Sequence, residues 1–210
     1  EEENDFSDLA AFIGVLENSS DGSLVCDLDA LFNTYDYLKV MAAQIFCGDW
    51  DGYLYNKNNF YLYHNTSTGK FEYIPYDVDN TFGIDWFNID WANRNIYGWQ
   101  PGGSEVRPLY NRLINNPVLR EQFSRYADQL IGSTLDPDSL VQAIEERKNM
   151  IASYVGTDPY YPLDYGYDFE DFLNSYTSAI GAHVKWGLYP YLSARALSMA
   201  EQTEEGSMAP

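Results

Sequence analysis

Four aspartates and one asparagine flank a short aromatic segment of this chain. Asp49 and Asp51 precede the run FYLYHNTSTGKFEYIPY, Asn59 stands directly before it, and Asp77 and Asp79 follow it. Carboxylate and amide oxygens are the ligands that Mg²⁺, Mn²⁺ or Ca²⁺ prefer. Carboxylates gathered without a cation or a proton would repel one another. These residue types therefore indicate a divalent-cation site, provided that the segment between them brings its two ends together.

The intervening segment has the pattern of a β-hairpin. Two aromatic, β-prone runs, NFYLYH and KFEYIPY, are separated by the turn residues NTSTG. Strand alternation places Phe60 and Leu62 on one face and Tyr61 and Tyr63 on the other. Pro75 has no backbone N–H, so it makes the second strand an edge or ends it there. Because the ends of a hairpin meet, the flanking carboxylates are expected to converge.

Helical periodicity dominates outside the hairpin. Residues 5–18 and 36–48 each place apolar side chains on one face; Ser7 is the expected cap of the first helix. Gly48 is expected to end the second. Prolines 117 and 137 directly follow Asn116 and Asp136, so these two residues are expected to cap two further helices.

The remaining segments complete a mostly helical α+β prediction. Residues 83–105, rich in Trp, Asn and Gly, have no period and predict a long loop. Residues 168–202 predict two helical segments broken near Gly187 and Pro190. We expect one domain over residues 1–200 and a disordered tail over 201–210.

Composition excludes some classes of function. The 210-residue chain carries a net charge of -20 and only 12 Lys and Arg residues, which excludes a protein that binds nucleic acid through phosphate contacts. No apolar run reaches the length of a membrane span. Cys26 and Cys47 form neither a CxxC pair nor a metal spacing, which leaves two buried thiols or one disulfide as alternatives.

The stretch GDWDGYLYNKNNFYLYHNTSTGKFEYIPYDVDNTFG, residues 48–83, resembles the CotH kinase family of spore-coat-type atypical protein kinases. Members of that family typically show a D-x-Y segment, an asparagine before an aromatic Y-L-Y strand, and a block I-P-W-D-x-D-x-T-F-G. Here the block reads IPYDVDNTFG, with Tyr76 where tryptophan is usual. The resemblance extends from about Asp5 to Arg195 but is specific only in residues 48–83.

The resemblance implies a protein-kinase-like C-lobe with one β-hairpin and gives each site residue a role. Asp51 would be the catalytic aspartate and Asn59 a metal ligand. Asp77 would hold metal as the kinase DFG aspartate does, and Asp79 would be a second ligand or would orient the first. Asp49 has no role other than that of a cap. The implied cofactors are Mg²⁺ or Mn²⁺ (or Ca²⁺) and ATP, and the implied substrate is Ser or Thr of a protein.

One departure from a kinase is plain in the sequence. A kinase also needs an N-terminal lobe with a lysine for the phosphates. The only Lys or Arg before Asp51 is Lys39, within a predicted helix. The resemblance therefore implies an upstream N-lobe, little activity in this chain alone, and an extracellular, cell-surface or spore-coat location.

A second function remains open at this point. The chain would then be a non-catalytic binding or structural module of an extracellular or cell-surface assembly. Trp86, Trp91 and Trp99 of the long loop could stack on sugar rings or a peptide, or they could pack beneath that loop. Ligand binding requires at least two of the three indoles to be exposed on a common face.

Overall fold

The computed structural model describes residues 5–103, 105–163 and 166–208, with side chains through Thr203. Its elements in chain order are α1 (Ser7–Asn18), α2 (Leu24–Asp29), α3 (Thr34–Cys47), α4 (Tyr53–Asn56), β1 (Phe60–Asn65), β2 (Lys70–Pro75), α5 (Pro108–Asn115), α6 (Pro117–Ile131), α7 (Pro137–Val155), the 3-10 helix η1 (Tyr161–Leu163), α8 (Phe169–Asn174) and α9 (Leu188–Met208). The fold is mixed and mostly helical, with one two-stranded antiparallel sheet.

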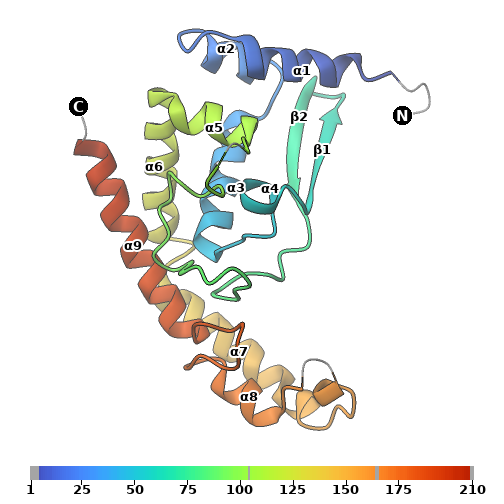
Figure 1. Cartoon of the computed structure of the whole chain (residues 1–210), viewed down its shortest axis with the longest axis vertical. Helices are drawn as coiled ribbons and strands as arrows, with labels where there is room; N and C mark the ends of the chain where they lie inside the picture. The colour runs from blue at the N-terminus through green and yellow to red at the C-terminus, as the bar shows by residue number, and fades with distance from the viewer. Residues whose placement is uncertain (1–4, 104, 164–165, 209–210) are drawn as a thin grey trace.

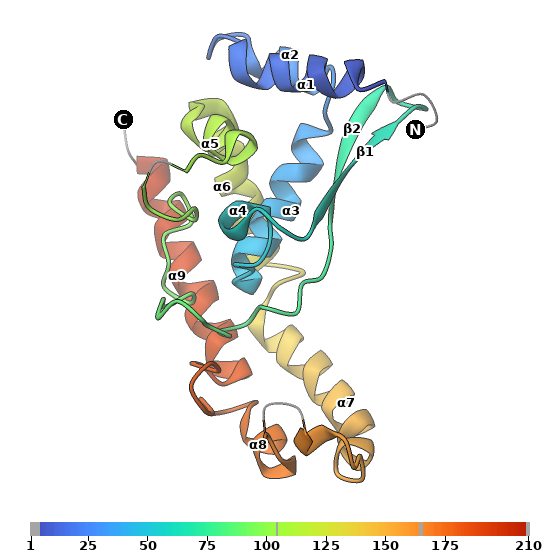
Figure 2. The same cartoon turned by 45° about the vertical axis from the view of Figure 1, so that its right-hand side comes forward.

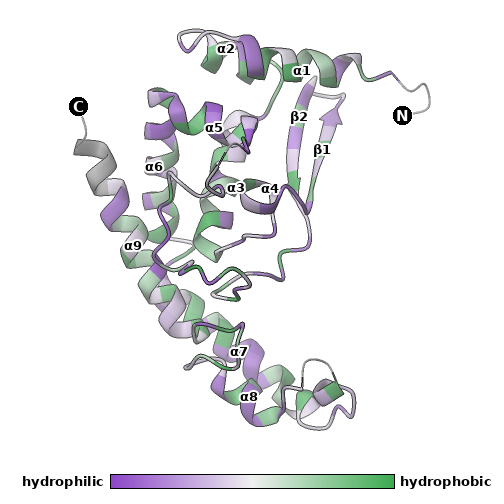
Figure 3. Cartoon of the chain, in the orientation of Figure 1, coloured by the Kyte–Doolittle hydropathy of each residue, from purple (hydrophilic) through white to green (hydrophobic). Residues whose placement is uncertain are grey.

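Helix α3 runs through the middle of the main body (Figures 1 and 2). The hairpin lies along one side of it, and α6 and α9 lie along the other. Helices α1 and α2 cross one end of the body, while α7 and α8 project from the opposite end. Helix α7 mixes hydrophilic and hydrophobic residues and has no buried side chain (Figure 3). The hairpin and the loop after α3, which carry the candidate site, belong to the main body.

Helix α3 leads directly into the acidic segment. Its predicted apolar face is confirmed, because five side chains of that face are buried: Leu38, Met41, Ala42, Ile45 and Phe46. The helix ends at Gly48, which has the left-handed conformation with φ of 76°. A side chain at Gly48 would also overlap the hydroxyl of Tyr191 on α9. Glycine is needed here both for the backbone conformation and for the close approach of α9.

The hairpin has the predicted strands and faces. Phe60 pairs with Pro75 and Tyr61 with Ile74, and Pro75 is the last residue of β2. The outward side chains Tyr61 and Tyr63 are 56% and 55% exposed, whereas the inward Tyr73 is 8% exposed. This alternation confirms that one face of the hairpin packs on the body.

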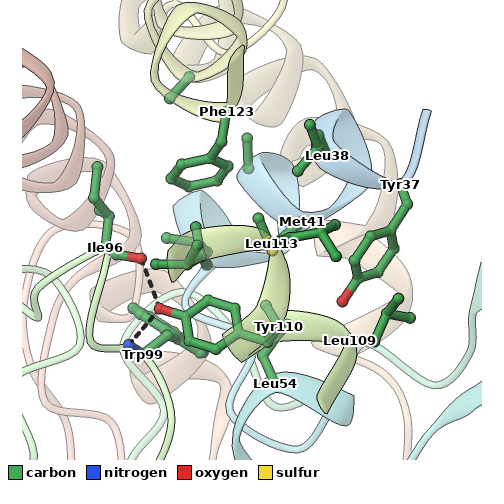
Figure 4. Packing of buried hydrophobic residues seen from close by; sticks show 14 of the residues in the cluster. Tyr37, Leu38, Met41, Leu54, Ile96, Trp99, Leu109, Tyr110, Leu113 and Phe123 are labelled. Carbon is green, nitrogen blue, oxygen red and sulfur yellow. Dashed lines mark hydrogen bonds between the residues drawn. The ribbon is translucent and has the colours of Figure 1, made fainter. Parts of the chain in front are cut away.

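The long loop, described over residues 83–103, contributes to the core instead of covering it. Trp91 and Trp99 are 1% and 0% exposed, and their rings lie 5.3 Å apart. Figure 4 shows Tyr110 of α5 beside this loop. The Tyr110 hydroxyl donates to the carbonyl of Ile96 at 3.1 Å and accepts from the backbone N–H of Trp99 at 2.9 Å. A single phenol thus ties the irregular loop to the helical core.

Several expectations for the helices are confirmed and others are corrected. The side chain of Asn116 accepts from the N–H groups of Val118 and Leu119, and Asp136 caps α7 through Ser139. Ser7 does not cap α1 but is its first residue. The tail predicted to be disordered from residue 201 continues α9 as far as Met208, and residues 209–210 lie outside the described residues.

Two further observations bear on the sequence-based expectations. Cys26 is exposed and Cys47 half-buried, and both are free thiols, so the disulfide alternative is not formed. No helix in the part of the chain that the structure describes is both long and apolar enough to cross a membrane.

Candidate functional site

Asp51 lies in the loop after α3, and side-chain amides surround its carboxylate. Asn56 donates to Oδ1 at 2.5 Å, Asn59 donates to Oδ2 at 3.0 Å, and Asn80 approaches Oδ2 at 3.5 Å. These donors come from α4, from the start of β1 and from the segment after β2. The hairpin therefore brings Asn80, which follows β2, to a carboxylate that precedes β1.

Asn80 links the two ends of the hairpin directly. Its side-chain nitrogen donates to Asp79 Oδ1 at 2.9 Å and also faces Asp51 Oδ2. One amide group thus stands between two carboxylates that are 28 positions apart in the sequence. The partial positive charge of the amide hydrogens offsets the repulsion between these two carboxylates.

The backbone is strained on both sides of this junction. Asn59 and Asp77 have φ values of 52° and 48°, in the left-handed region that asparagine and aspartate tolerate better than most residues. A backbone hydrogen bond of 3.0 Å from Tyr76 N–H to the Asn59 carbonyl joins Asn59 to the residue that precedes Asp77. The side chains of Asp77 and Asp79 remain exposed.

The site is not preassembled as a cluster of acidic metal ligands. Within residues 5–103, 105–163 and 166–208, no three His, Cys, Asp or Glu side chains are grouped closely enough to hold a metal ion. Contrary to expectation, the carboxylates therefore do not lie close enough together for all of them to share one ion. The Asn80 amide nitrogen still lies within reach of both Asp51 and Asp79, which come from opposite ends of the hairpin. The carboxylate and amide oxygens here are of the kind that bind a hard divalent cation. Asn59, Asp77 and Asp79 are the residues that would hold it.

Asp49 has a different environment from the other aspartates. It is 2% exposed, and its Oδ2 accepts from Gln44 Nε2 at 2.6 Å. Burial raises the pKa of Asp49 to about 6, although the hydrogen bond from Gln44 acts in the opposite direction. The sequence assigns Asp49 only a capping role. Its burial depends on packing between α3 and the hairpin, which the residue pattern does not reveal.

The long loop positions the acidic segment. Trp99 Nε1 donates to the backbone carbonyl of Asp49 at 3.2 Å, and Trp50 Nε1 donates to the carbonyl of Ile84 at 2.9 Å. These two reciprocal bonds fix the start of the Asp51 loop against residues 84–99. Trp99 thus acts as a support of the site, a role that the sequence did not predict.

The prediction that the long loop presents a ligand-binding face of exposed indoles is wrong. Trp91 and Trp99 are buried, whereas Trp86 is 50% exposed and stacks on His183 with ring centroids 3.7 Å apart. Two exposed indoles on a common face were required. Instead, the Trp91 indole donates to the buried carboxylate of Asp85 at 3.0 Å. The physical reason is that an indole with a buried acceptor for its N–H gains more from packing than from exposure.

Lys39 is directed away from the site. Its ammonium pairs with Asp36 on the same helix at 2.8 Å. The only basic residue before Asp51 therefore serves a surface ion pair on α3. This placement agrees with its predicted location in a helix.

These features define a class: a mostly helical α+β protein with an acidic site where the two ends of one hairpin meet. A family model described as CotH kinase protein matches residues 1–184. The chain therefore belongs to the CotH kinase protein family.

The chain is similar to curated proteins from a fungus and a bacterium. It is 22% identical to Invasin CotH2 of Rhizopus delemar over 202 residues, which cover 87% of this chain and 33% of that protein. It is 27% identical to Inner spore coat protein H of Bacillus subtilis over 129 residues, which cover 59% of this chain and 32% of that protein. The chain spans about a third of the length of these relatives.

Proposed function

We propose that this chain is the C-terminal lobe of a CotH-type atypical protein kinase and transfers the γ-phosphoryl group of ATP to a Ser or Thr hydroxyl of a protein. The observation that carries the proposal is the constellation at the end of the hairpin. Asp51 is held there by the amides of Asn56, Asn59 and Asn80, and Asn80 also reaches Asp79. The family match supports the assignment independently.

Asp51 is the proposed acceptor of the substrate proton. The hydroxyl oxygen of the acceptor forms a bond to the γ-phosphorus, the bond from that phosphorus to the β–γ bridging oxygen breaks, and the hydroxyl proton passes to Asp51. The amide donors orient its carboxylate before the acceptor arrives. Such fixed orientation is a major part of catalysis in phosphoryl transfer.

Asn59, Asp77 and Asp79 are the proposed ligands of Mg²⁺ or Mn²⁺. The cation would neutralise charge on the phosphate oxygens. Phe60 pairs with Pro75, so Asn59, just before β1, and Asp77, two residues after β2, lie at the same end of the hairpin. The exposed side chains of Asp77 and Asp79 leave room for a ligand on that side.

The nucleotide side of the site is proposed to come from residues outside this chain. Lys39 is engaged with Asp36 on α3 and does not provide the phosphate-binding lysine. The relatives are named for invasins and for an inner spore coat protein, and these names support a spore-coat or cell-surface setting for this chain.

The test is a labelled-ATP transfer assay with Mg²⁺ or Mn²⁺. It compares the 210-residue chain, a version extended upstream, and the extended version carrying Asp51→Asn or Asp77→Ala. We expect little transfer from the short chain, robust transfer from the extended chain, and loss of transfer in both variants. An extended Asp138→Asn variant is the matched control, since Asp138 is exposed on α7, away from the site.

Two results would change the assignment. Robust transfer by the short chain would show that the nucleotide side is complete without an added segment. No transfer by the extended chain would favour a non-catalytic binding or structural module. The burial of Trp91 and Trp99 removes the indole face that was expected to serve that module.

A further inference from the structure

One amide side chain stands between the proposed base and a proposed metal ligand. Asn80 Nδ2 donates to Asp79 Oδ1 at 2.9 Å and faces Asp51 Oδ2 at 3.5 Å. The first distance is that of a good hydrogen bond to a charged acceptor, and the second is at the outer limit for a hydrogen bond. Asp79 is therefore the acceptor that Asn80 holds more firmly.

The two carboxylates depend on Asn80 to different degrees. The Asp79 side chain is exposed, and among the described residues its carboxylate accepts a hydrogen bond from Asn80 only. Asp51 also accepts from Asn56 at 2.5 Å and from Asn59 at 3.0 Å. Withdrawal of Asn80 would thus leave Asp51 hydrogen-bonded but would leave the Asp79 carboxylate to solvent or to a cation.

The backbone around Asn80 is fixed, so its side chain can change partner without a movement of the fold. Thr81 N–H donates to the Asp79 carbonyl at 3.0 Å. Phe82 N–H donates at 2.6 Å to the carbonyl of Cys47, the last residue of α3. Rotation of the Asn80 side chain therefore requires no shift of α3 or of the hairpin.

The Asn80 amide opposes ligation of a divalent cation by Asp79. A carboxylate oxygen that binds Mg²⁺ lies about 2.0–2.1 Å from the ion. Asn80 directs a hydrogen with partial positive charge, the same sign as the ion, at Oδ1 of that carboxylate. Within the described ranges, no three acidic, His or Cys side chains are already placed to hold an ion. A change of side-chain partners is therefore needed before the proposed ligands can act together.

We infer that Asn80 is a positioning residue that competes with the cation for Asp79 while its amide stays directed at Asp51. This inference rests on the proposed function, because it takes Asp79 as a metal ligand and Asp51 as the base. In the cation-free chain, Asn80 screens the two carboxylates from each other. When Asp79 turns to the ion, Asn80 gives up that hydrogen bond and keeps Asp51 as its acceptor. One side chain thus links the metal site to the orientation of the base.

The test measures Mn²⁺ binding to the 210-residue chain through the electron paramagnetic resonance signal of the free ion. The binding that Asp77→Ala abolishes is the component of interest, which separates the site from diffuse attraction to an acidic chain. Asn80→Ala should bind Mn²⁺ more tightly by a factor of about three to ten, because no hydrogen bond at Asp79 has to be broken.

Asn93→Ala is the matched control. Asn93 Nδ2 donates to Asp90 Oδ2 at 2.8 Å within the long loop, so this pair is an amide and a carboxylate of the same kind. Its loss should leave the affinity of the site unchanged.

A second measurement requires no variant to fold. In the proton–nitrogen NMR spectrum of the natural chain, Mg²⁺ should shift the side-chain amide signals of Asn80, because one amide hydrogen loses a charged acceptor. The shift should saturate as the Mg²⁺ concentration rises. The side-chain amide signals of Asn93 should stay in place.

The possible outcomes separate this inference from the proposed function. Weaker Mn²⁺ binding in Asn80→Ala would show that Asn80 is itself a ligand, and unchanged binding would show that its hydrogen bond does not compete with the ion. Either result, or an Asn80 amide signal that does not respond to bound Mg²⁺, overturns the inference and leaves the proposed function standing. If the natural chain shows no binding that depends on Asp77, the proposed metal site is wrong and this inference fails with it.

Discussion

The acidic end of the hairpin and the long loop over residues 83–103, here called the Trp loop, are both irregular and rich in Asn, Asp and aromatic residues. The carboxylates of the acidic end are largely exposed, whereas the Trp loop buries two of its indoles and one of its carboxylates. In the Trp loop, the Asp85 carboxylate is 2% exposed and accepts from Phe87 N–H, Ile89 N–H and the Trp91 indole. At the acidic end, Asp51 accepts from side-chain amides, and Asp77 and Asp79 face solvent.

The two carboxylates differ in the kind of group that donates to them: two backbone N–H groups and a buried indole for Asp85, and side-chain amides for Asp51. Donors to Asp85 come from the six residues that follow it, so the Trp loop folds around its own carboxylate and can be buried. Donors to Asp51 are the side-chain amides of Asn56, Asn59 and Asn80, which lie five, eight and 29 residues further along the chain. That arrangement leaves the acidic end open to a ligand.

The largest expected effect tests the buried half of this comparison. Trp99→Ala should lower the free energy of unfolding by about 3–5 kcal/mol, because it leaves a cavity and removes the donor to the Asp49 carbonyl. Urea denaturation measures the change. Trp86→Ala is the control and should cost less than about 1 kcal/mol, since Trp86 is half-exposed. Equal losses in the free energy of unfolding for the two variants would show that the core and surface indoles do not differ in their contribution to stability.

The second prediction concerns the buried aspartate between the two regions. Burial raises the pKa of Asp49 from its ordinary value of 3.8 to about 6. The folded state therefore holds its proton more tightly than the unfolded state does. The contribution of Asp49 to stability is best below pH 4, declines between about pH 4 and 6, and is least favourable above that window.

Asp49→Asn should remove this penalty. At pH 8 the variant should be more stable than the natural chain by on the order of 2 kcal/mol, and the advantage should vanish near pH 4. Urea denaturation at both pH values makes the comparison, with Asp138→Asn as the surface control. A variant that is less stable at pH 8 would show that the hydrogen bond from Gln44 outweighs the burial of charge.

The third prediction tests the open half of the comparison. Mg²⁺ or Mn²⁺ at ten times its dissociation constant should stabilise the chain by about 1.4 kcal/mol, and removal of the metal with a chelator should reverse the effect. Asp77→Ala should lose this stabilisation because it removes a proposed ligand. Thermal unfolding with and without metal measures it. A full metal effect in Asp77→Ala would place the ion elsewhere, whereas Asp138→Asn should retain the effect.

The smallest expected effect separates strain from ligation. Asp77 has a left-handed backbone, which glycine adopts without a steric penalty. Asp77→Gly should therefore match or exceed the stability of the natural chain by up to about 1 kcal/mol in the absence of metal. Asp79→Gly is the matched substitution at a position without a left-handed backbone, so it relieves no strain and should be destabilising. If the two variants cost the same in urea denaturation, strain at Asp77 is not significant.

Local patterns in the sequence determined the elements that carry the site. The strand alternation set the faces of the hairpin, Gly48 set the end of α3, and Asn116 and Asp136 set the starts of α6 and α7. Each of these features depends on neighbouring residues and on backbone conformation. Asp51 and Asn59 both precede β1, and the short helix α4 between them brings their side chains together.

The tertiary structure alone decided the burial of Asp49 and of the Trp loop, and the bridging role of Asn80. The backbone N–H of Trp99 donates to the hydroxyl of Tyr110 on α5, and the Asp49 carboxylate accepts from the side chain of Gln44 on α3. The same Asp, Asn and Trp residue types occur in the exposed and buried loops, so composition could not separate them. The distinction depends on which donors and apolar surfaces the fold brings to each side chain, because a polar group is stable in the core only when such a partner is present.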